Sequence, residues 1–166
     1  MEHVIRLATE QDITGYQSFV VGILSERLET LISRVQPPTP EQTRQFVLGH
    51  LGAPSALFIA ESEGQIIGAL DLTRPERPEL NHRSSIGMSV AAPFRRKGVG
   101  RALLQTAAQW ASAHGIERIE LEVLALNLAA IKLYEAQSFV REGVRRQAIK
   151  RGDSYIDLIM YAKQVE

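Results

Sequence analysis

Three cationic residues and two glycines stand together in one short segment, Arg95, Arg96, Lys97, Gly98, Val99 and Gly100. Both glycines allow positive φ and a close approach of the backbone to a ligand. The first N–H groups of a following helix lack partners within that helix, and its N-terminus carries about half a positive charge. Anions bind well at such a place. The segment therefore predicts a cradle for a diphosphate.

Three other interpretations of this segment can be compared with the sequence. A P-loop requires lysine and a hydroxyl residue after its last glycine, and neither Gly98 nor Gly100 is followed by them. A dinucleotide-binding turn requires a third small residue where this chain has Leu103. A solvated basic turn before a helix remains open on this segment alone.

The residues before the cradle predict the strand that positions it. Ile86, Met88 and Val90 alternate with small residues, which is the period of a half-buried strand, and Pro93 ends the run. Apolar positions repeat at helical spacing from Val99 to Trp110, and Gly115 is a natural helix stop. We expect a strand, a basic turn and a helix in this order.

The cradle matches the R/Q-x-x-G-x-G/A signature of the GNAT superfamily of acyl-coenzyme A-dependent N-acetyltransferases. Residues 119–139 resemble the second motif of that family: a strand, then Asn127, then a short helix carrying Tyr134, then Phe139. The two motifs occur in the right order and separation, and together they are more specific than either alone. The resemblance covers about the C-terminal half of the chain.

The resemblance implies a site for acetyl-coenzyme A. In the family, the strand of the first motif splays from the next strand, and the pantetheine arm pairs with the open edge through backbone groups, as in strand addition. The N–H groups of residues 96–101 would hold the pyrophosphate. The cofactor contacts implied in this way are Met88, Ser89, Val90, Arg95, Arg96, Lys97, Gly98, Val99, Gly100, Arg101, Asn127, Ala130 and Tyr134.

The resemblance also suggests the acid of the reaction. Tyr134 matches the family tyrosine near the thioester sulfur, and a phenol pKa of about 10 lies just above a thiol pKa of about 8.5. It would protonate the departing thiolate as general acid. The alternative is a half-buried tyrosine that packs its helix on the sheet. Asn127 would bind the cofactor arm, cap its helix, or do both.

The general base is not marked by the sequence. Many family members carry a glutamate on the first-motif strand, whereas residues 84–88 contain no carboxylate. Glu26 and Asp71 are the candidates, because both regions border the acceptor cleft in the family, and a chain of waters is the alternative. Tyr155 and Asp157 on the last hairpin could also approach the acceptor. A weak base favours an amine of low pKa, such as an α-amine.

The bulk composition limits the partners. The 166 residues contain 19 basic and 19 acidic residues, and this balance argues against nucleic acid or an anionic membrane as the main partner. The absence of cysteine excludes disulfides, thiolate metal sites and an acyl-cysteine intermediate. The four histidines are scattered, so we expect no metal. No leader or long apolar stretch is present, and we expect a soluble, cytoplasmic protein.

The hydrophobic pattern predicts one domain over residues 1–166. The expected segments are a strand at 3–7, helical spacing at 16–32, a helix at 40–50, strands at 56–60, 65–72 and 86–90, a helix at 98–114, a strand at 119–123, a helix from 127, and a hairpin of 139–149 and 154–162. The resemblance implies the same order, an α/β (α+β) fold with a mixed, mostly antiparallel sheet of about seven strands flanked by helices.

We therefore expect an N-acetyltransferase that moves the acetyl group of acetyl-coenzyme A to a primary amine of a small metabolite such as an amino acid, by direct attack in a ternary complex. A protein N-terminus is an alternative acceptor. A coenzyme A-binding regulatory domain that catalyses nothing is an alternative from a different class, which the missing glutamate leaves open. Family members often form homodimers, although no residue here marks an interface.

Overall fold

The computed structural model describes residues 2–32 and 36–166, which form an eight-stranded sheet flanked by helices. The strands are β1 (Val4–Leu7), β2 (Leu51–Gly52), β3 (Ser55–Ser62), β4 (Gln65–Thr73), β5 (Arg83–Val90), β6 (Arg118–Leu124), β7 (Val140–Arg151) and β8 (Ser154–Gln164). The helices are α1 (Ile13–Ser25), α2 (Pro40–Leu48), α3 (Val99–Ala113) and α4 (Leu128–Ala136), with short 3-10 turns η1 (Glu10–Asp12), η2 (Pro78–Leu80) and η3 (Ala92–Phe94). The sheet order is β1-β3-β4-β5-β6-β8-β7, with β2 paired to β3.

The predicted fold class and element order are confirmed, with two differences. The short strand β2 was not expected, because two residues carry no detectable alternation. The helical spacing of residues 16–32 predicted helix as far as Ile32, but α1 ends at Ser25 and Arg27 has a φ of +51°. A left-handed residue breaks the helix, and the apolar Leu31 then packs from a turn rather than from a helix.

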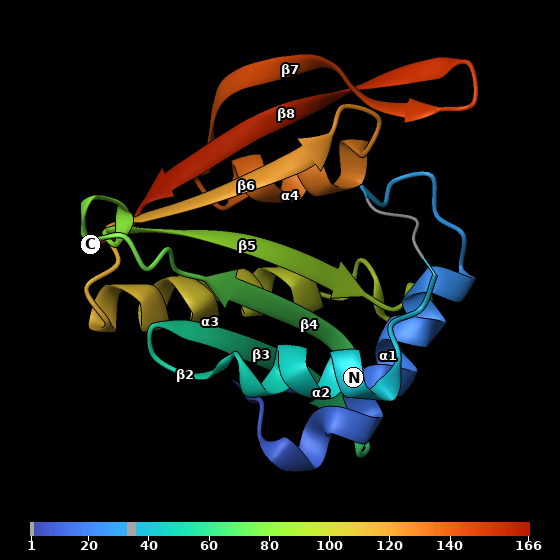
Figure 1. The fold of residues 1–166 in the computed structure, drawn as a ribbon, viewed down its shortest axis with the longest axis vertical. Helices are drawn as coiled ribbons and strands as arrows, with labels where there is room; N and C mark the ends of the chain where they lie inside the picture. Colours follow the sequence, from blue (N-terminus) through green and yellow to red (C-terminus); the bar gives the residue numbers. More distant parts are fainter. Residues whose placement is uncertain (1, 33–35) are drawn as a thin grey trace.

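Two apolar clusters cover the two faces of the sheet. Residues of α1 and α2, with Tyr16 and Val47 among them, pack over Leu57 and Ile59 of β3. On the opposite face, α3 and α4 cover a larger core that includes Phe58. Figure 1 shows α1 and α2 in front of the sheet and α3 and α4 behind it. Ligands that approach from the two sides of the sheet therefore meet different helices.

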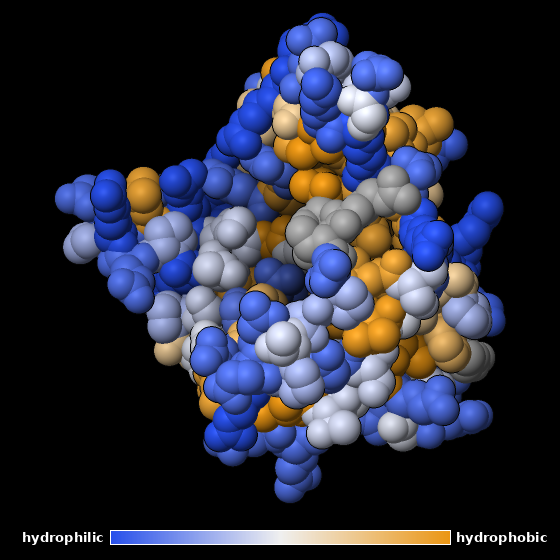
Figure 2. Space-filling model, turned by 45° about the vertical axis from the view of Figure 1, so that its right-hand side comes forward, coloured by the Kyte–Doolittle hydropathy of each residue, from blue (hydrophilic) through white to orange (hydrophobic). Residues whose placement is uncertain are grey.

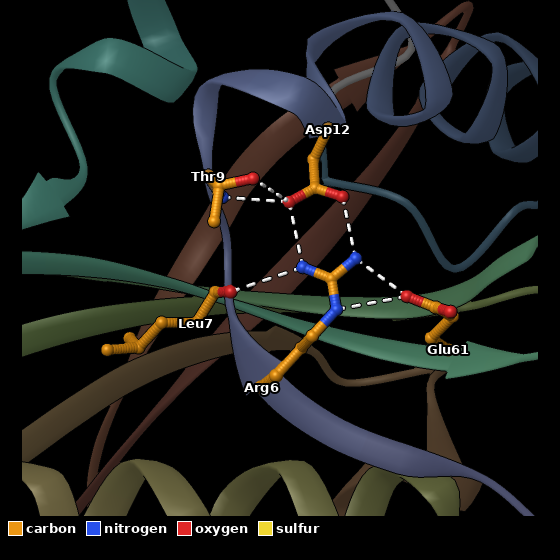
Figure 3. Close-up of polar contacts among 5 residues, drawn as sticks. All are labelled: Arg6, Leu7, Thr9, Asp12 and Glu61. Atoms are coloured by element: carbon orange, nitrogen blue, oxygen red, sulfur yellow. Dashed lines mark hydrogen bonds and ion pairs between the residues drawn. The ribbon is translucent and has the colours of Figure 1, made fainter. Parts of the chain in front are cut away.

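Arg6 ties the start of the chain to the sheet (Figure 3). Its guanidinium donates to both oxygens of the Asp12 carboxylate, at 2.7 and 2.8 Å, and to Glu61 Oε2 at 2.6 and 3.0 Å. Asp12 also accepts hydrogen bonds from the backbone N–H and the hydroxyl of Thr9. Hydrogen bonds from Arg6 lower the pKa of Asp12 to about 2, against the opposing effect of burial. The network fixes β1 and η1 against β3.

β5 and β6 form the only parallel pair of strands among the described residues, and they part after three residues. The register runs from Arg83↔Arg118 to Ser85↔Glu120, although β5 continues to Val90 and β6 to Leu124. Figure 1 shows the two strands close together at their starts and diverging toward their ends. Beyond Ser85, β5 pairs with β4 on one side and has an open edge on the other. This is the splay that the resemblance implied.

The hairpin of β7 and β8 is irregular along β7. Its register shifts between Arg145 and Ile149, where Gln147 has a φ of +53° and donates its N–H to Asp157 Oδ1 at 2.8 Å. The carboxylate of Asp157 thus stabilises a bulge, which gives it a structural use. Bulges bend a strand. At the tip, the predicted turn is present, with Gly152 at a φ of +58°.

Candidate active site

The basic turn forms the N-terminal end of α3. Gly98 has a φ of +86°, as predicted, and the first bond of the helix runs from the Ala102 N–H to the Gly98 carbonyl at 3.0 Å. The N–H groups of the preceding residues Val99, Gly100 and Arg101 have no acceptor one turn earlier in the helix. Arg96 has a φ of +60°. These N–H groups lie where the predicted cradle needs donors, and binding of an anion there stays a prediction.

Gly100 differs from its prediction. We expected positive φ at Gly100, but this residue belongs to the regular helix α3 and is absent from the positive-φ residues of the described chain. It is needed for close packing instead: a Cβ at Gly100 would lie 3.0 Å from Leu133 Cδ2 and 3.5 Å from Met88 Cε. The missing side chain lets the cradle approach both α4 and β5.

Arg95 and Glu26 form a brace between the cradle and α1. One guanidinium nitrogen of Arg95 pairs with Glu26 Oε2, and Arg95 Nε donates to the Val90 carbonyl at 2.8 Å. Glu26 Oε1 accepts the Ala92 N–H at 3.1 Å. The sequence suggested Arg95 as a cofactor contact and Glu26 as a general base, whereas these contacts engage both side chains in positioning. The brace joins the end of α1 to the end of β5.

Tyr134 lies in the core between α4 and the sheet. It is buried, and its ring meets Phe139 edge to face, with centroids 5.7 Å apart. Burial raises the pKa of its hydroxyl to about 12. Because this pKa lies far above 7, the hydroxyl stays protonated at neutral pH. Within residues 2–32 and 36–166 it has no hydrogen-bond partner, so it is available as a donor.

Asn127 caps α4. Its side-chain Oδ1 accepts the Ala130 N–H at 3.2 Å, which is the capping role weighed from the sequence. The cap fixes the first turn of the helix that carries Tyr134. Asn127 and Ala130 therefore set the position of Tyr134, whatever else they contact.

Asp71 lies on the α1–α2 face, beside the strand with the open edge. It pairs with Gly87 across β4 and β5, and a Cβ at Gly87 would lie 2.8 Å from Asp71 Oδ1. Burial raises the pKa of Asp71, while the charge of His50 and the backbone N–H groups of Asp71 and Gly87 lower it. A carboxylate reaches the middle of β5 from the neighbouring strand. β5 itself supplies no acid there.

A stack of rings that the sequence analysis did not bring together includes Tyr16, which responds to the charge of Asp71. The Tyr16 ring stacks on Phe46 with centroids 5.8 Å apart, and the Phe46 ring lies 4.4 Å from that of His50. Burial and the charge of Asp71 raise the pKa of Tyr16. The helical spacing from residue 16 marks Tyr16 only as one apolar position of a helix, and His50 is one of the four scattered histidines. Tyr16, the neighbouring pair of Phe46 and His50, and Asp71 come from three segments that are 20 or more positions apart along the chain, so no local pattern marks them as one cluster.

The arrangement suits proton transfer on two sides of the open edge. Asp71 stands with α1 and α2, and Tyr134 stands with α3 and α4.

Within the described residues, no group of three or more metal-binding side chains is found. In the same part of the chain, every helix is too short or too polar to cross a membrane.

Comparisons with known proteins agree with this geometry. Residues 22–139 match the sequence profile described as the Acetyltransferase (GNAT) family. N-acetyltransferase family 8 member 3 of Rattus norvegicus is 34% identical over 92 residues, which are 54% of this chain and 40% of that protein. L-amino acid N-acetyltransferase AaaT of Escherichia coli is 28% identical over 107 residues, which are 64% of this chain and 66% of that protein. The chain spans less than half the length of the rat relative.

Solved structures share the whole fold. The acetyltransferase of the GNAT family from Streptococcus pneumoniae superposes with a TM-score of 0.89 and 26% identity, covering 99% of this chain and 100% of that chain. The structure of yncA from Salmonella typhimurium, solved with its cofactor acetyl-CoA, has a TM-score of 0.88 and 15% identity, covering 100% and 95%. The second likeness concerns the fold alone.

Proposed function

The chain belongs to the acetyltransferase (GNAT) family, and we propose that it moves the acetyl group of acetyl-coenzyme A to a primary amine of a small metabolite. The observation that supports this most directly is the parting of β5 from β6 after Ser85, next to the glycine turn at the start of α3. An open strand edge accepts an amide-bearing arm, and a helix N-terminus accepts a diphosphate.

The residues of the site fit acetyl-coenzyme A. The backbone of Met88, Ser89 and Val90 would pair with its pantetheine arm, and the N–H groups of residues 96–101 would hold its pyrophosphate. Lys97 is exposed and lies 5.8 Å from the Phe94 ring centroid, which leaves its ammonium at the turn. Acetyl-coenzyme A supplies the thioester carbon that an amine attacks.

Asp71 and Tyr134 divide the proton transfers. Asp71 accepts a proton from the amine as the new C–N bond forms, and a backbone N–H near Val90 polarises the carbonyl. Tyr134 donates its proton to the sulfur as the C–S bond breaks. A pKa of about 12 makes Tyr134 a weak acid, but the same apolar surroundings raise the pKa of a thiol as well. The amine attacks directly, in a complex that holds both substrates.

The acceptor is proposed at the level of its chemistry. AaaT is named as an L-amino acid acetyltransferase, and this chain resembles it over 64% of its length. We infer an amino acid or a related metabolite, with a protein N-terminus as the second acceptor. A non-catalytic coenzyme A-binding domain is the second function, and the missing glutamate of the first-motif strand favours it.

Thermal denaturation with acetyl-coenzyme A, coenzyme A, ATP and NAD tests the binding site, because a ligand that binds only the native state raises the midpoint. We expect a rise with the two coenzyme A compounds alone. Release of free thiol with a panel of amines then tests transfer. Tyr134→Phe should keep the thermal shift and lower the rate about 100-fold. A shift without thiol release from any amine would establish the binding domain instead.

A further inference from the structure

A cavity of about 620 Å³ lies between the segment after α1 and the tip of the β7–β8 hairpin. Volumes of this size hold small molecules. Its apolar lining is formed by Leu24, Leu31, Ile32 and Ile149, and its cationic lining by Arg27, Lys150 and Arg151. None of the described lining residues is acidic. We call it the Lys150 cavity.

Two sets of contacts hold the walls of the Lys150 cavity in place. The guanidinium of Arg151 donates to the backbone carbonyls of Glu29 and Leu31, and its side chain is only 16% exposed. This ties the hairpin tip to the segment after α1. On the other side, the brace of Glu26 and Arg95 fixes the end of α1. The two walls come from distant parts of the chain and are joined before any ligand binds.

The Lys150 cavity opens at the end of the splayed strand. Leu24 and Arg27 lie within two residues of Glu26, whose carboxylate accepts the Ala92 N–H just beyond β5. Figure 1 places the hairpin tip over the side where β5 and β6 diverge. Figure 2 shows hydrophilic and hydrophobic side chains mixed on the upper lobe and on the body beneath it. The Lys150 cavity therefore adjoins the proposed reaction site.

The cationic side chains of the lining differ in how far other groups of the protein already engage them. Arg151 is occupied by two carbonyls and by Glu29, whose carboxylate lies 3.5 Å away. The Lys150 ammonium lies 5.6 Å from the centroid of the Tyr155 ring and forms no ion pair with a carboxylate of the described chain. A concave site lined by one sign of charge raises the local concentration of opposite charge. The lining favours an anion attached to an apolar chain.

We propose that the Lys150 cavity binds an anionic group of the acceptor, a carboxylate or phosphate, while the acceptor amine reaches Asp71. This inference rests on the proposed function. Tyr16, whose pKa responds to Asp71, lies eight residues before Leu24, about 12 Å along α1. Leu24 belongs to the lining of the Lys150 cavity, so this path along α1 separates the two ends of the acceptor by about 12 Å.

The spacing selects one class of acceptor. The α-carboxylate of an amino acid is attached to the same carbon atom as its nitrogen and does not span about 12 Å, the separation that the helix rise gives. Among the amino acids and related metabolites of the proposed function, this selects an elongated primary amine whose anionic group lies several bonds from the nitrogen, and not an α-amino acid bound through its α-carboxylate. The apolar residues of the lining suit the chain between the two ends.

The test measures acetyl transfer to ω-amino acids of increasing length, to their ω-amides and to aminoalkyl phosphates. Where the length fits, we expect the KM of the carboxylate to be about 10-fold below that of its amide, because the carboxylate forms a charge-assisted contact. Lys150→Gln should remove this difference and leave the amide unchanged. Lys150→Arg should retain it. Lys163→Gln, at the far end of β8, is the matched control.

Three outcomes would overturn the proposal. The wild type could show no lower KM for the carboxylate than for the amide at any length. Lys150→Gln could raise the KM of carboxylate and amide equally, or could raise the KM of acetyl-coenzyme A alone. Calorimetric titration of the coenzyme A-bound protein with the same probes separates this proposal from the proposed function. Lys150-dependent binding without transfer would retain the anion site and reject the enzyme. Acetyl transfer to amides and carboxylates at equal KM would retain the proposed enzyme and reject the anion site. A preference for aminoalkyl phosphates over ω-amino acids would support the proposal with a phosphate as the anionic group of the acceptor.

Discussion

In the proposed mechanism Asp71 takes the place of the acid that β5 lacks, and its carboxylate has room beside β5 because Gly87 has no side chain. We expect Asp71→Asn to lower kcat/KM about 100-fold or more, the usual contribution of a general base. In the wild type the rate should rise with pH through a pKa above the ordinary range of an aspartate, because burial raises the pKa of Asp71. Asp71→Asn should lose this rise of the rate with pH, which a pH profile of kcat/KM measures.

Stability distinguishes this role from a structural one. A carboxyl whose folded pKa is raised binds its proton more tightly in the native state, so stability falls as pH rises from the unfolded to the folded pKa. Asp71→Asn should therefore leave the melting temperature unchanged or raise it at pH 7. Gly87→Ala, whose Cβ would meet Asp71 Oδ1 at 2.8 Å, should lower activity with the carboxylate retained. Wild-type rates in Asp71→Asn would reject the base.

The brace of Glu26 and Arg95 acts at the scale of elements, because it joins α1 to the end of β5. We expect Glu26→Gln to keep the rate within about 3-fold, since a general base would cost about 100-fold or more. Glu26→Gln keeps an acceptor for the Ala92 N–H and should lose about 0.5 kcal/mol, whereas Glu26→Ala should lose about 1–2 kcal/mol. Urea unfolding and initial rates on the same samples measure both effects.

Arg95 supplies the cross-check for the brace. A double-mutant cycle of Glu26→Gln with Arg95→Gln should give a coupling energy for stability, because the two side chains form one ion pair. Additive effects on stability would reject the brace. A 100-fold loss of rate in Glu26→Gln with unchanged stability would make Glu26 the general base.

Local patterns explain how much of these elements could be predicted. Alternation over residues 86–90 and Gly98 before α3 are local signals, and both structures are present. Helical spacing did not reveal the end of α1, because Leu31 is apolar whether it packs from a helix or from a turn. The cluster of Asp71, Tyr16 and His50 forms only when three elements meet, so no spacing along the chain could predict it.

The network of Arg6, Asp12 and Glu61 concerns the whole molecule, since it joins the N-terminal strand to the sheet far from the site. Hydrogen bonds from Arg6 lower the folded pKa of Asp12 to about 2, below the unfolded value of about 3.9. A lowered pKa stabilises the native state above the unfolded pKa, and this stabilisation is lost as pH falls toward the folded one. The difference corresponds to about 2 kcal/mol at neutral pH.

We therefore expect Asp12→Asn to lower the free energy of unfolding by about 2 kcal/mol at pH 7, with the deficit shrinking between about pH 4 and pH 2. Urea denaturation across this range measures it. Glu79→Gln, an exposed acid in η2 for which the described residues provide no ion-pair partner, should show no such deficit. The kcat of Asp12→Asn at 25 °C should stay within about 2-fold, because distant sites contribute independently. A deficit of constant size down to pH 2 would mean that Asp12 acts through packing and not through its charge.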